Sequence, residues 1–563
     1  MGDIDYQSLR LPYRPLPAGA PTHHPIIVVG AGPVGLSMAL DLSHHGHSVV
    51  VLDDDNTLSV GSRAICFAKR TLDVWDRLGV GERMVQKGVS WNVGRLFFRD
   101  DEVWNFDLLP EAGHRRPAFI NLQQYYCEGY LYEKCESDPR IDLRWKNRVT
   151  GVADNDKGPV TLTVETPDGT HMLQADWVIA CDGARSPMRK MLGQEAHGQI
   201  FRDRFLIADV KLEADFPTER WFWFDPPFHP NQSVLLHSQP DNVWRIDFQL
   251  GWDADPAEEV KPEKVLPRIR ALLGKDIDVQ LEWVSVYTFA CERMDAFRHG
   301  RVFFAGDAAH RVSPFGARGA NSGVQDVDNL AWKLDLVMRG VAPAALLDTY
   351  GEEREFAADE NIRNSTRSTD FITPKSETSL MFRNAVLRLA KKHDFARRLV
   401  NSGRLSEATF YTESSLNTPD TDEFNAKLPV GAVAPDGPVT RDGHTVWWLS
   451  QLGQTPGAFT VAFFCDETLP DRALLTQLDN PGSQSIPVRC ILVVPPALER
   501  DITPDFDYVV DHDAILAGRY DVRTGACYLI RPDQHIAARW RVADIATIQK
   551  AVRRATRTQE VSS

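Results

Sequence analysis

A glycine pattern near the start of the chain limits the folds open to it more than any other feature. The apolar run Ile26–Val29 is typical of a strand buried on both faces, and it leads directly into Gly30-x-Gly32-x-x-Gly35. A helix to about His45 should follow, because Gly46 stands where a helix C-cap belongs. This order of strand, glycine turn and helix predicts a dinucleotide-binding unit. The alternative is a glycine-rich turn in a plain α/β domain.

Each position of the glycine pattern has a mechanical role in such a unit. Gly30 permits the tight turn, Gly32 lets the backbone approach a pyrophosphate, and Gly35 lets the helix pack against the strand. Pro33 lies inside the same turn, and the helix that follows offers amide donors and a positive dipole to the phosphates. We therefore count Gly30, Gly32, Pro33 and Gly35 as cofactor-binding residues.

An acidic cluster follows the second predicted strand, Ser48–Leu52. Asp53 is placed to accept hydrogen bonds from adenosine ribose hydroxyls. Asp54 and Asp55 come directly after it, and three carboxylates would repel a 2′-phosphate. The site therefore suits the ADP half of NAD or FAD and not that of NADP.

Two later stretches distinguish FAD from NAD. Residues 175–189 form a predicted strand that ends in Asp182-Gly183, and residues 300–310 form another that ends in Gly306-Asp307. A glycine-rich turn then opens a long helix, Val324–Met338, which makes a second anion-binding site. Because one extended cofactor touched by both regions explains their separation, the sequence favours FAD.

Together these pieces resemble the class A flavoprotein monooxygenases, the aromatic-ring hydroxylases that share the p-hydroxybenzoate hydroxylase fold. The match covers about Pro25 to Glu355, and members acting on 3-(3-hydroxyphenyl)propionate or phenol are the most similar. The resemblance implies an α/β fold in which a Rossmann-type FAD domain is interrupted by an antiparallel substrate sheet. It assigns residues 25–90, 120–190 and 292–405 to the FAD domain, and residues 91–119 and 195–291 to the sheet.

The resemblance also implies FAD contacts outside the first glycine turn. Asp53 would contact the adenosine ribose, and Arg63 the diphosphate. Gln124 corresponds to the family's FAD-binding glutamine, with Gln123 as the alternative. Further cofactor contacts are implied for Asp182, Gly183, Gly306, Asp307, Pro314, Gly319, Ala320 and Asn321. In this set Asp182 would also take part in NAD(P)H binding, and Asp307 would hold the ribityl chain. The backbone at residues 319–321 would face the flavin pyrimidine.

One position departs from the family pattern. Members usually carry Gly-Gln-Gly before the last turn, whereas this chain has Ala317-Arg318-Gly319. The Arg318 guanidinium could act in catalysis by stabilising reduced flavin, or it could bind a substrate carboxylate. The alternative is that Arg318 points to solvent or pairs with a nearby acid.

The predicted substrate sheet carries the candidates for substrate binding and catalysis. In the aromatic segment Trp221–Phe228, Trp221 and Trp223 share one strand face, so Trp223 is a candidate pocket wall, unless these rings are ordinary core. Candidates for a base are His237, Asp247 and Tyr287, and Arg245 could hold a carboxylate bidentately. With Trp223, the substrate-site candidates are Arg245, Asp247 and Pro314, and the catalytic candidates are His237, Tyr287 and Arg318, although each sheet residue could instead be structural.

The C-terminal third is predicted to form a separate group of strands after a polar segment. Residues 406–427 are predicted as a polar linker, and strands return in residues 428–545. This part resembles the thioredoxin-like domain appended to phenol hydroxylase relatives. It lacks a Cys-x-x-Cys pair, so dithiol chemistry is excluded and a structural or oligomerisation role is expected.

Composition adds general limits. The charge of 63 − 78 = −15 disfavours nucleic acid as a partner, and no run approaches the roughly 18–20 apolar residues of a membrane span. The first twenty residues lack the features of a signal peptide, and the eight scattered cysteines suggest neither a zinc ribbon nor a redox pair. We expect a cytoplasmic protein without a metal centre, and a homodimer is compatible with these features.

The resemblance implies a single-component enzyme that uses NAD(P)H and O₂. It would hydroxylate a small phenolic substrate through a C4a-hydroperoxyflavin. Two other functions stay open: an FAD-dependent reductase or halogenase of related fold, and a non-catalytic flavin-binding scaffold. The halogenase motif Trp-x-Trp-x-Ile-Pro is only superficially similar to the segment that starts at Trp221.

Overall fold

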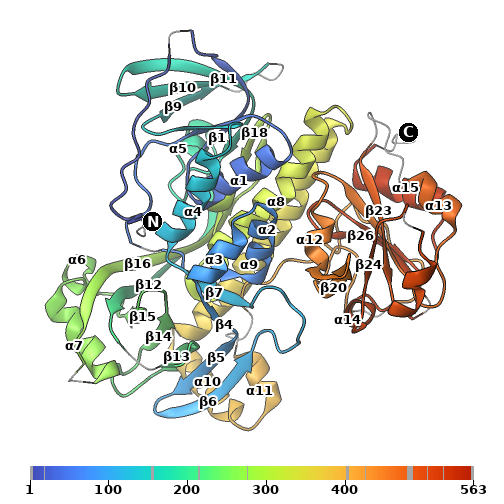
Figure 1. The fold of residues 1–563 in the computed structure, drawn as a ribbon. Coiled ribbons are helices and arrows are strands. Elements are labelled where there is room, and N and C mark those ends of the chain that lie inside the picture. The colour runs from blue at the N-terminus through green and yellow to red at the C-terminus, as the bar shows by residue number, and fades with distance from the viewer. Residues whose placement is uncertain are drawn as a thin grey trace.

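A largely parallel sheet carries the first glycine turn (Figure 1). The computed structural model describes residues 4–17, 19–61, 63–153, 158–213, 216–274, 277–400, 405–424, 427–478, 486–503, 505–523 and 525–558. The sheet order is β17-β18-β11-β1-β2-β8, with β10 and β9 attached to β11. Its strands are β1 (His23–Val29), β2 (Val49–Leu52), β8 (Ile141–Arg144), β9 (Arg148–Ala153), β10 (Val160–Thr166), β11 (Gly169–Ala180), β17 (Arg298–His299) and β18 (Val302–Phe304).

The two predicted strands and the first predicted helix form as expected. The β-branched residues of β1 and β2 are buried, and the chain turns at Gly30 into α1 (Pro33–His44). Helix α8 (Gly319–Met338) packs against α1, so both glycine turns lie near one another although they are far apart in sequence. The other helices around this sheet are α2 (Lys69–Arg77), α3 (Gly81–Lys87), α4 (Gln124–Glu136), α5 (Pro187–Met191) and α9 (Asp348–Ile372).

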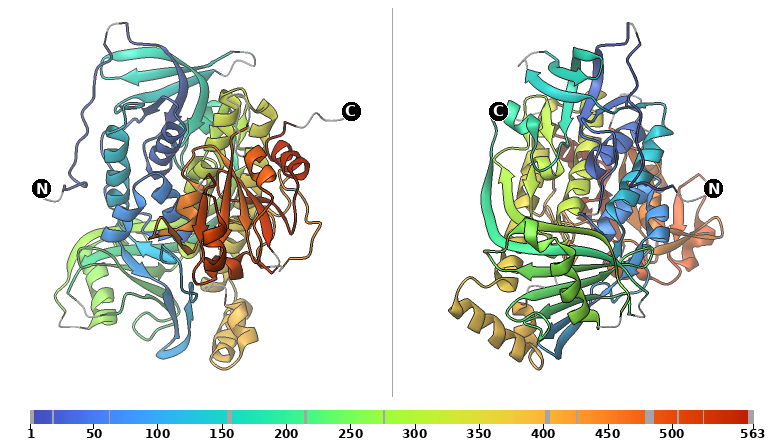
Figure 2. Two further views of the ribbon diagram at one scale, coloured as in Figure 1. Left: turned by 45° about the vertical axis from the view of Figure 1, so that its right-hand side comes forward. Right: turned by 90° about the vertical axis from the view of Figure 1, so that its left-hand side faces the viewer.

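The predicted substrate sheet is an eight-stranded sheet in the order β19-β16-β12-β15-β14-β13-β5-β6 (Figure 2). Its pairs are antiparallel except for β13 with β5. One face packs on α7 (Pro262–Leu273), and the other meets the turn before α8. Its strands are β5 (Val93–Phe98), β6 (Asp101–Asp107), β12 (Ala196–Lys211), β13 (Arg220–Phe224), β14 (Ser233–Ser238), β15 (Val243–Leu250), β16 (Gln280–Met294) and β19 (His310–Arg311).

Two smaller groups of elements join these sheets. A three-stranded sheet of β3 (Cys66–Ala68), β7 (Phe119–Asn121) and β4 (Val89–Trp91) lies between them. Helices α10 (Glu377–Ala390) and α11 (Asp394–Leu399) pack on the antiparallel sheet through Val386, Leu387 and Ala396. The sequence prediction had assigned this segment to the FAD domain, but its apolar side chains complete the core of the other sheet.

The C-terminal part is a seven-stranded mixed sheet covered on both faces by helices (Figure 1, orange to red). Strands β22, β23 and β24 are parallel, whereas β25 and β26 form an antiparallel hairpin at one edge. Its elements are β20 (Pro438–Arg441), β21 (His444–Trp447), α12 (Trp448–Leu452), β22 (Phe459–Phe464), α13 (Arg472–Leu478), β23 (Val488–Val494), β24 (Tyr508–Val510), α14 (Ile515–Arg519), β25 (Ala526–Ile530), β26 (Ile536–Trp540) and α15 (Ile545–Ala555). Positions 425–426 of the predicted linker lie outside the described residues.

The C-terminal sheet shares its core with the helices of the FAD-binding part. Trp332 and Leu336 of α8 are buried with Phe459 and Val461 of β22 in one apolar cluster. Within the described ranges, no helix is both long and apolar enough to cross a bilayer.

Candidate functional site

The geometry at the first glycine turn matches the predicted role of each glycine. Gly30 has φ +106°, and a Cβ there would lie 2.4 Å from the carbonyl oxygen of Cys181. A Cβ on Gly35 would lie 1.9 Å from the carbonyl oxygen of Gly30, so the helix can approach the turn only with glycine there. A Cβ on Gly32 would meet no atom within 4 Å, which leaves the backbone open to a ligand. Pro33 begins α1 next to this open position.

Asp53 alone of the three predicted acids faces the glycine turn. Its Oδ2 accepts a hydrogen bond from the Ala31 amide at 2.6 Å, and burial raises the pKa of Asp53 to about 6. Asp54 and Asp55 are exposed, and Asp55 lies 3.6 Å from Lys146. The expectation that all three carboxylates gather at the ribose is therefore wrong, because the chain turns outward after Asp53.

The second turn brings Asp307 to the start of α8. Gly306 has φ +62°, and its amide donates to Oδ2 of the buried Asp326 at 2.8 Å. The Asp307 side chain is accessible to solvent although Gly306 and Ala308 are buried. Desolvation by the surrounding chain raises the pKa of Asp307, and the nearby His310, Arg311 and Arg63 side chains oppose the shift. An accessible acid this deep in the fold suits a ligand that carries hydroxyl groups.

The first turn of α8 is held to the rest of the site by Asn321. Its Oδ1 accepts from the Ala68 amide at 2.8 Å, and its Nδ2 donates to the Cys66 carbonyl at 2.9 Å. A Cβ on Gly319 would have no neighbour closer than 3.9 Å, so the backbone of Gly319 and Ala320 borders open space. This arrangement leaves the positive end of a 20-residue helix facing the Asp307 side of the site.

Arg318 is buried, with 2% of its surface exposed. Its guanidinium folds back over Gly316, where a Cβ would lie 1.5 Å from Nη1. The alternative that Arg318 points to solvent is therefore wrong. Pro314, a predicted contact of both substrate and cofactor, is exposed between the buried Ser313 and Phe315.

The remaining predicted FAD residues have local partners. Gln124 binds the segment that leads to Arg63, because its Oε1 accepts from the Ala64 amide at 3.1 Å and its Nε2 donates to Ser59 Oγ at 2.9 Å. Gln123 instead donates to the Pro240 carbonyl of the substrate sheet at 3.0 Å. Gln124 is therefore the one of the pair that lies beside Ser59 and Ala64, next to Arg63, and its contact with FAD stays a prediction.

Asp182 binds the start of the short helix α5, whose N-cap is Ser186. Its Oδ1 accepts from Ser186 Oγ at 2.6 Å and its Oδ2 accepts from the Met188 amide at 2.9 Å, while burial raises the pKa of Asp182. Gly183 follows with φ +75°, a conformation that favours glycine. These contacts shape the turn at the end of β11. They give the Asp182 side chain a structural role that does not require a contact with NAD(P)H.

The substrate sheet has one face toward the flavin turns and one toward α7. Phe222 and Leu235 share a core with Phe315 of the flavin-side turn, whereas Trp223 packs with the α7 side and stacks on Phe97 at 5.2 Å. The prediction of Trp223 as a substrate contact is therefore wrong, because strand alternation turns it to the opposite face. The same alternation places Trp221 on that outer face.

Arg245 does face the flavin side, but its fork is already occupied. Its Nε and Nη2 bind the two carboxylate oxygens of Asp209 at 2.8 and 2.7 Å. Its Nη1 donates to the Arg63 carbonyl at 3.3 Å. Arg245 is therefore not placed to hold a substrate carboxylate bidentately, and it links the sheet to the FAD-binding part.

Arg220, at the start of β13, was missed by the sequence analysis. Only 8% of its surface is exposed, and its one hydrogen bond in the described chain goes to the Phe315 carbonyl at 3.3 Å. Among the described residues it forms no salt bridge, and desolvation lowers the pKa of Arg220. An arginine keeps its charge in proteins, and a buried charge is costly unless paired. Its spacing with Phe222 and Phe224 on alternate positions could have indicated that it faces the same side.

Three candidate bases share this inner face but differ in protonation. Burial and the charges of Arg220 and Arg245 hold the pKa of His237 well below its ordinary value, so its ring is neutral at pH 7. Burial raises the pKa of Asp247 to about 6, and its Oδ2 lies 3.8 Å from His237 Nε2. Burial raises the pKa of Tyr287, which lies two strands from Asp247 in the sheet order.

Comparison with known proteins identifies the family. A family model described as an FAD binding domain matches residues 23–365. The chain belongs to this family. A probable NADH-specific resorcinol 4-hydroxylase of Rhodococcus jostii is 34% identical over 59% of this chain and 62% of its own length. A 3-(3-hydroxy-phenyl)propionate/3-hydroxycinnamic acid hydroxylase of Mycolicibacterium smegmatis is 27% identical over 92% of this chain and 90% of its own length.

Solved structures agree on the fold. A flavin-dependent monooxygenase in complex with FAD and substrate superposes with a TM-score of 0.78 at 21% identity, covering 96% of this chain and 99% of its own. A p-nitrophenol 4-monooxygenase of Pseudomonas putida has a TM-score of 0.60 at 25% identity, over 69% of this chain and its full length. The predicted resemblance to FAD-dependent aromatic hydroxylases and the α/β fold are confirmed. The thioredoxin-like character of the C-terminal part stays a prediction.

Proposed function

We propose that this FAD-dependent hydroxylase uses NADH and O₂ to hydroxylate a small phenolic substrate that carries or develops a negative charge. The observation that carries the proposal is Arg220, which is buried on the sheet face that lies toward the flavin turns and forms no salt bridge among the described residues. The names of the relatives support a phenolic ring and NADH. Bound FAD would supply electron transfer from the nicotinamide and activation of oxygen.

Different residues of the chain suit successive parts of FAD. The open backbone at Gly32 and the start of α1 suit the diphosphate, and Asp53 suits the adenosine ribose. The accessible carboxylate of Asp307 suits the ribityl hydroxyls, and the first turn of α8 suits the polar edge of the flavin ring. These residues bind and orient the cofactor, while the apolar rings around Phe222 and Phe315 exclude water from the substrate side.

Asp247 is the base we assign for the phenol proton. A carboxylate with pKa about 6 is largely ionised at pH 7 and can accept a proton, whereas neutral His237 is better suited to orient it. Oδ1 of Asp247 is buried without a hydrogen-bond partner among the described residues, so a ligand hydroxyl bound next to it would satisfy it. His237, Tyr287 and Arg318 then have positioning roles in this proposal.

This assignment predicts a pH dependence. Because only ionised Asp247 accepts a proton, the rate of product formation should rise between pH 5 and 7, with an apparent pKa near 6. Asp247→Asn should lower the rate by about 100-fold or more and remove this limb, since general-base catalysis contributes about 10²–10⁴-fold. Single-turnover product formation against pH would measure both. A variant that keeps the wild-type limb would reject Asp247 as the base.

The reaction itself is tested with NADH and a panel of phenols. We expect slow NADH oxidation by the protein alone and at least about 10-fold faster oxidation with a productive phenol, since substrate binding gates reduction in enzymes with conformational steps. Mass spectrometry should find the phenol with one added oxygen. Panel members with a carboxylate side chain should respond more strongly than their methyl esters. A flat response across the panel would leave a reductase or a flavin-binding scaffold as the better description.

The cellular setting completes the proposal. The eight cysteines, all among the described residues, form no disulfide, and NADH is a cytoplasmic reductant, so we assign the enzyme to the cytoplasm. A homodimer stays a prediction, which sedimentation of the purified protein would test.

A further inference from the structure

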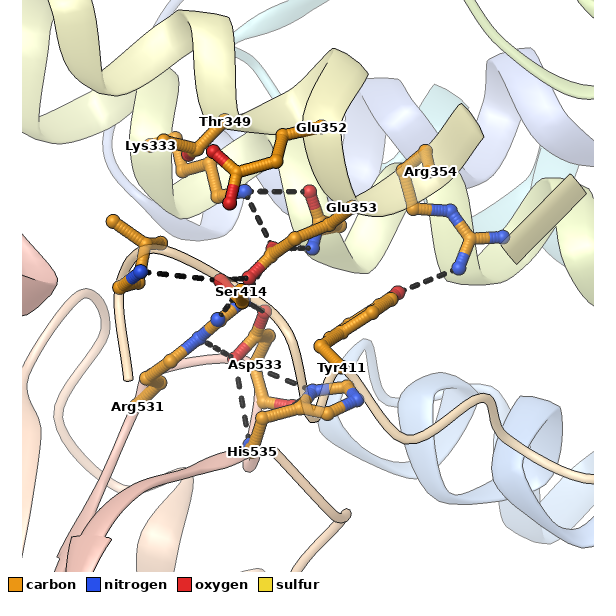
Figure 3. A network of polar contacts seen from close by, with 12 residues as sticks. Lys333, Thr349, Glu352, Glu353, Arg354, Tyr411, Ser414, Arg531, Asp533 and His535 are labelled. Carbon is orange, nitrogen blue, oxygen red and sulfur yellow. Dashed lines mark hydrogen bonds and ion pairs between the residues drawn. The ribbon is translucent and has the colours of Figure 1, made fainter. Parts of the chain in front are cut away.

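The loop of the β25–β26 hairpin, residues 531–535, leaves the C-terminal sheet and contacts the FAD-binding part. Figure 3 shows its Arg531, Asp533 and His535 directed toward α8, α9 and the segment around Tyr411. All three side chains are buried, and so are their partners Lys333 and Glu353. The hairpin therefore places charged groups in an interior that belongs to both parts of the chain.

The first set of contacts joins Arg531 to Glu353 of α9. Nη1 and Nη2 of Arg531 bind the two Glu353 oxygens at 2.5 and 2.9 Å, and Asp533 binds the same guanidinium. Lys333 of α8 binds Glu353 Oε2 at 2.7 Å. The four charges balance, and Glu353 is the shared acid that joins Arg531 of the hairpin to Lys333 of α8.

The second set begins at Tyr411, whose ring lies 4.6 Å from that of His535. The hydroxyl of Tyr411 accepts from Nη1 of Arg354 at 2.6 Å. Glu353 and Arg354 are adjacent in α9. The hairpin therefore contacts the first directly through Arg531 and the second indirectly through the Tyr411 ring. Arg354 also donates to the Ser322 carbonyl at 3.1 Å, in the first turn of α8.

These contacts lead to the flavin side of the site. Nε of Arg354 binds Oδ1 of Asp326 at 2.6 Å. The other oxygen of Asp326 accepts from the Gly306 amide and from His310 Nε2, each at 2.8 Å. Arg354 thus holds the Gly306 turn through Asp326 and the start of α8 through Ser322.

We propose that the 531–535 hairpin is a positioning element for the FAD site. Arg531 acts through Glu353, and His535 acts through the Tyr411 ring, whose hydroxyl binds Arg354, to fix the Gly306 turn against α8. The hairpin touches neither turn itself. The proposal goes beyond the assigned reaction, because it depends only on FAD binding by this chain and not on the identity of the phenol.

The choice of charged groups supports a positioning role over simple adhesion. Well-packed apolar residues can stabilise an interface as much as a buried ion pair, and such a pair demands a particular geometry. The adjacent Trp332 and Phe459 already supply apolar contact between the two parts. The ion pairs add direction, because the bidentate contact between Arg531 and Glu353 demands a particular orientation of α9.

Arg531→Met tests the proposal, with Arg539→Met as the matched control. Arg539 is buried on β26 and binds Asp420 through two nitrogens, but these contacts stay within the C-terminal third. We expect Arg531→Met to weaken FAD binding about 5- to 100-fold, the usual range of coupling between distant sites, and Arg539→Met to leave it within twofold. Dissociation of FAD from holoenzyme on dilution, followed by flavin fluorescence, measures this.

A second readout is independent of cofactor loading. Hydrogen–deuterium exchange should increase in residues 304–312 and 318–326 of Arg531→Met apoprotein, but not in the Arg539→Met variant. Arg531→Lys should restore part of the FAD affinity. If Arg531→Met fails to fold, Tyr411→Phe removes only the hydroxyl that Arg354 binds, and it should still speed FAD dissociation about threefold. Unchanged FAD dissociation and exchange in a folded Arg531→Met or Tyr411→Phe protein would overturn the proposal.

Discussion

Gly32→Ala should fold normally and bind FAD at least roughly 100-fold more weakly than the wild type. The added Cβ meets no protein atom within 4 Å, so apoprotein stability should change little. The same methyl group would occupy the space through which the backbone approaches the diphosphate. Losing two amide–phosphate hydrogen bonds of about 1.5–3 kcal/mol each gives this loss of affinity.

Gly35→Ala is the matched comparison, because it adds the same methyl group three residues later. There the Cβ would lie 1.9 Å from the Gly30 carbonyl oxygen, so α1 must move away from β1. We expect a loss of about 1–3 kcal/mol in the free energy of unfolding of the apoprotein, together with loss of FAD. Urea unfolding of the apoproteins and FAD titration separate the two variants. Equal destabilisation of both variants would contradict a ligand-facing Gly32.

Arg220→Met should raise the KM for an acidic phenol about 10- to 100-fold, since a hydrogen bond to a charged group contributes about 1.5–3 kcal/mol. The same substitution should increase the stability of the protein. Removing a buried charge that lacks a salt bridge should raise the melting temperature of the substrate-free protein. If Arg220 serves the substrate, the Arg220→Met variant should therefore bind the acidic phenol more weakly in steady-state kinetics and be more stable in thermal unfolding.

Arg383→Met provides the control for Arg220. Arg383 is also buried, contacts the Ile372 carbonyl at 3.2 Å and lies over the Phe224 ring at 5.6 Å, on the side of α10. We expect it to leave the KM for the acidic phenol within about twofold, because distant sites contribute independently. A fall in melting temperature with unchanged KM for Arg220→Met would assign Arg220 a structural role.

Local sequence was sufficient for the turns. Gly30 and Gly35 could be assigned because a φ of +106° and a 1.9 Å approach each exclude a side chain. Gly32 could be assigned only from its place in the pattern, since no protein atom would meet a Cβ there. The substrate side was harder to predict. Strand alternation showed that Trp223 and Phe222 face opposite ways, but only the packing of α7 and of Phe315 determined which face is outer.

The sequence by itself determined the FAD-binding units, their order and the residues at the tight turns, because these depend on contacts between near neighbours. The tertiary structure alone decided which charges are available. It paired Arg245 with Asp209, left Arg220 without a salt bridge to any described residue, and brought Arg531 to Glu353 across 178 positions of the chain. Pairing and desolvation depend on groups distant in sequence, so the electrostatics of this site follow from the folded arrangement and not from any motif.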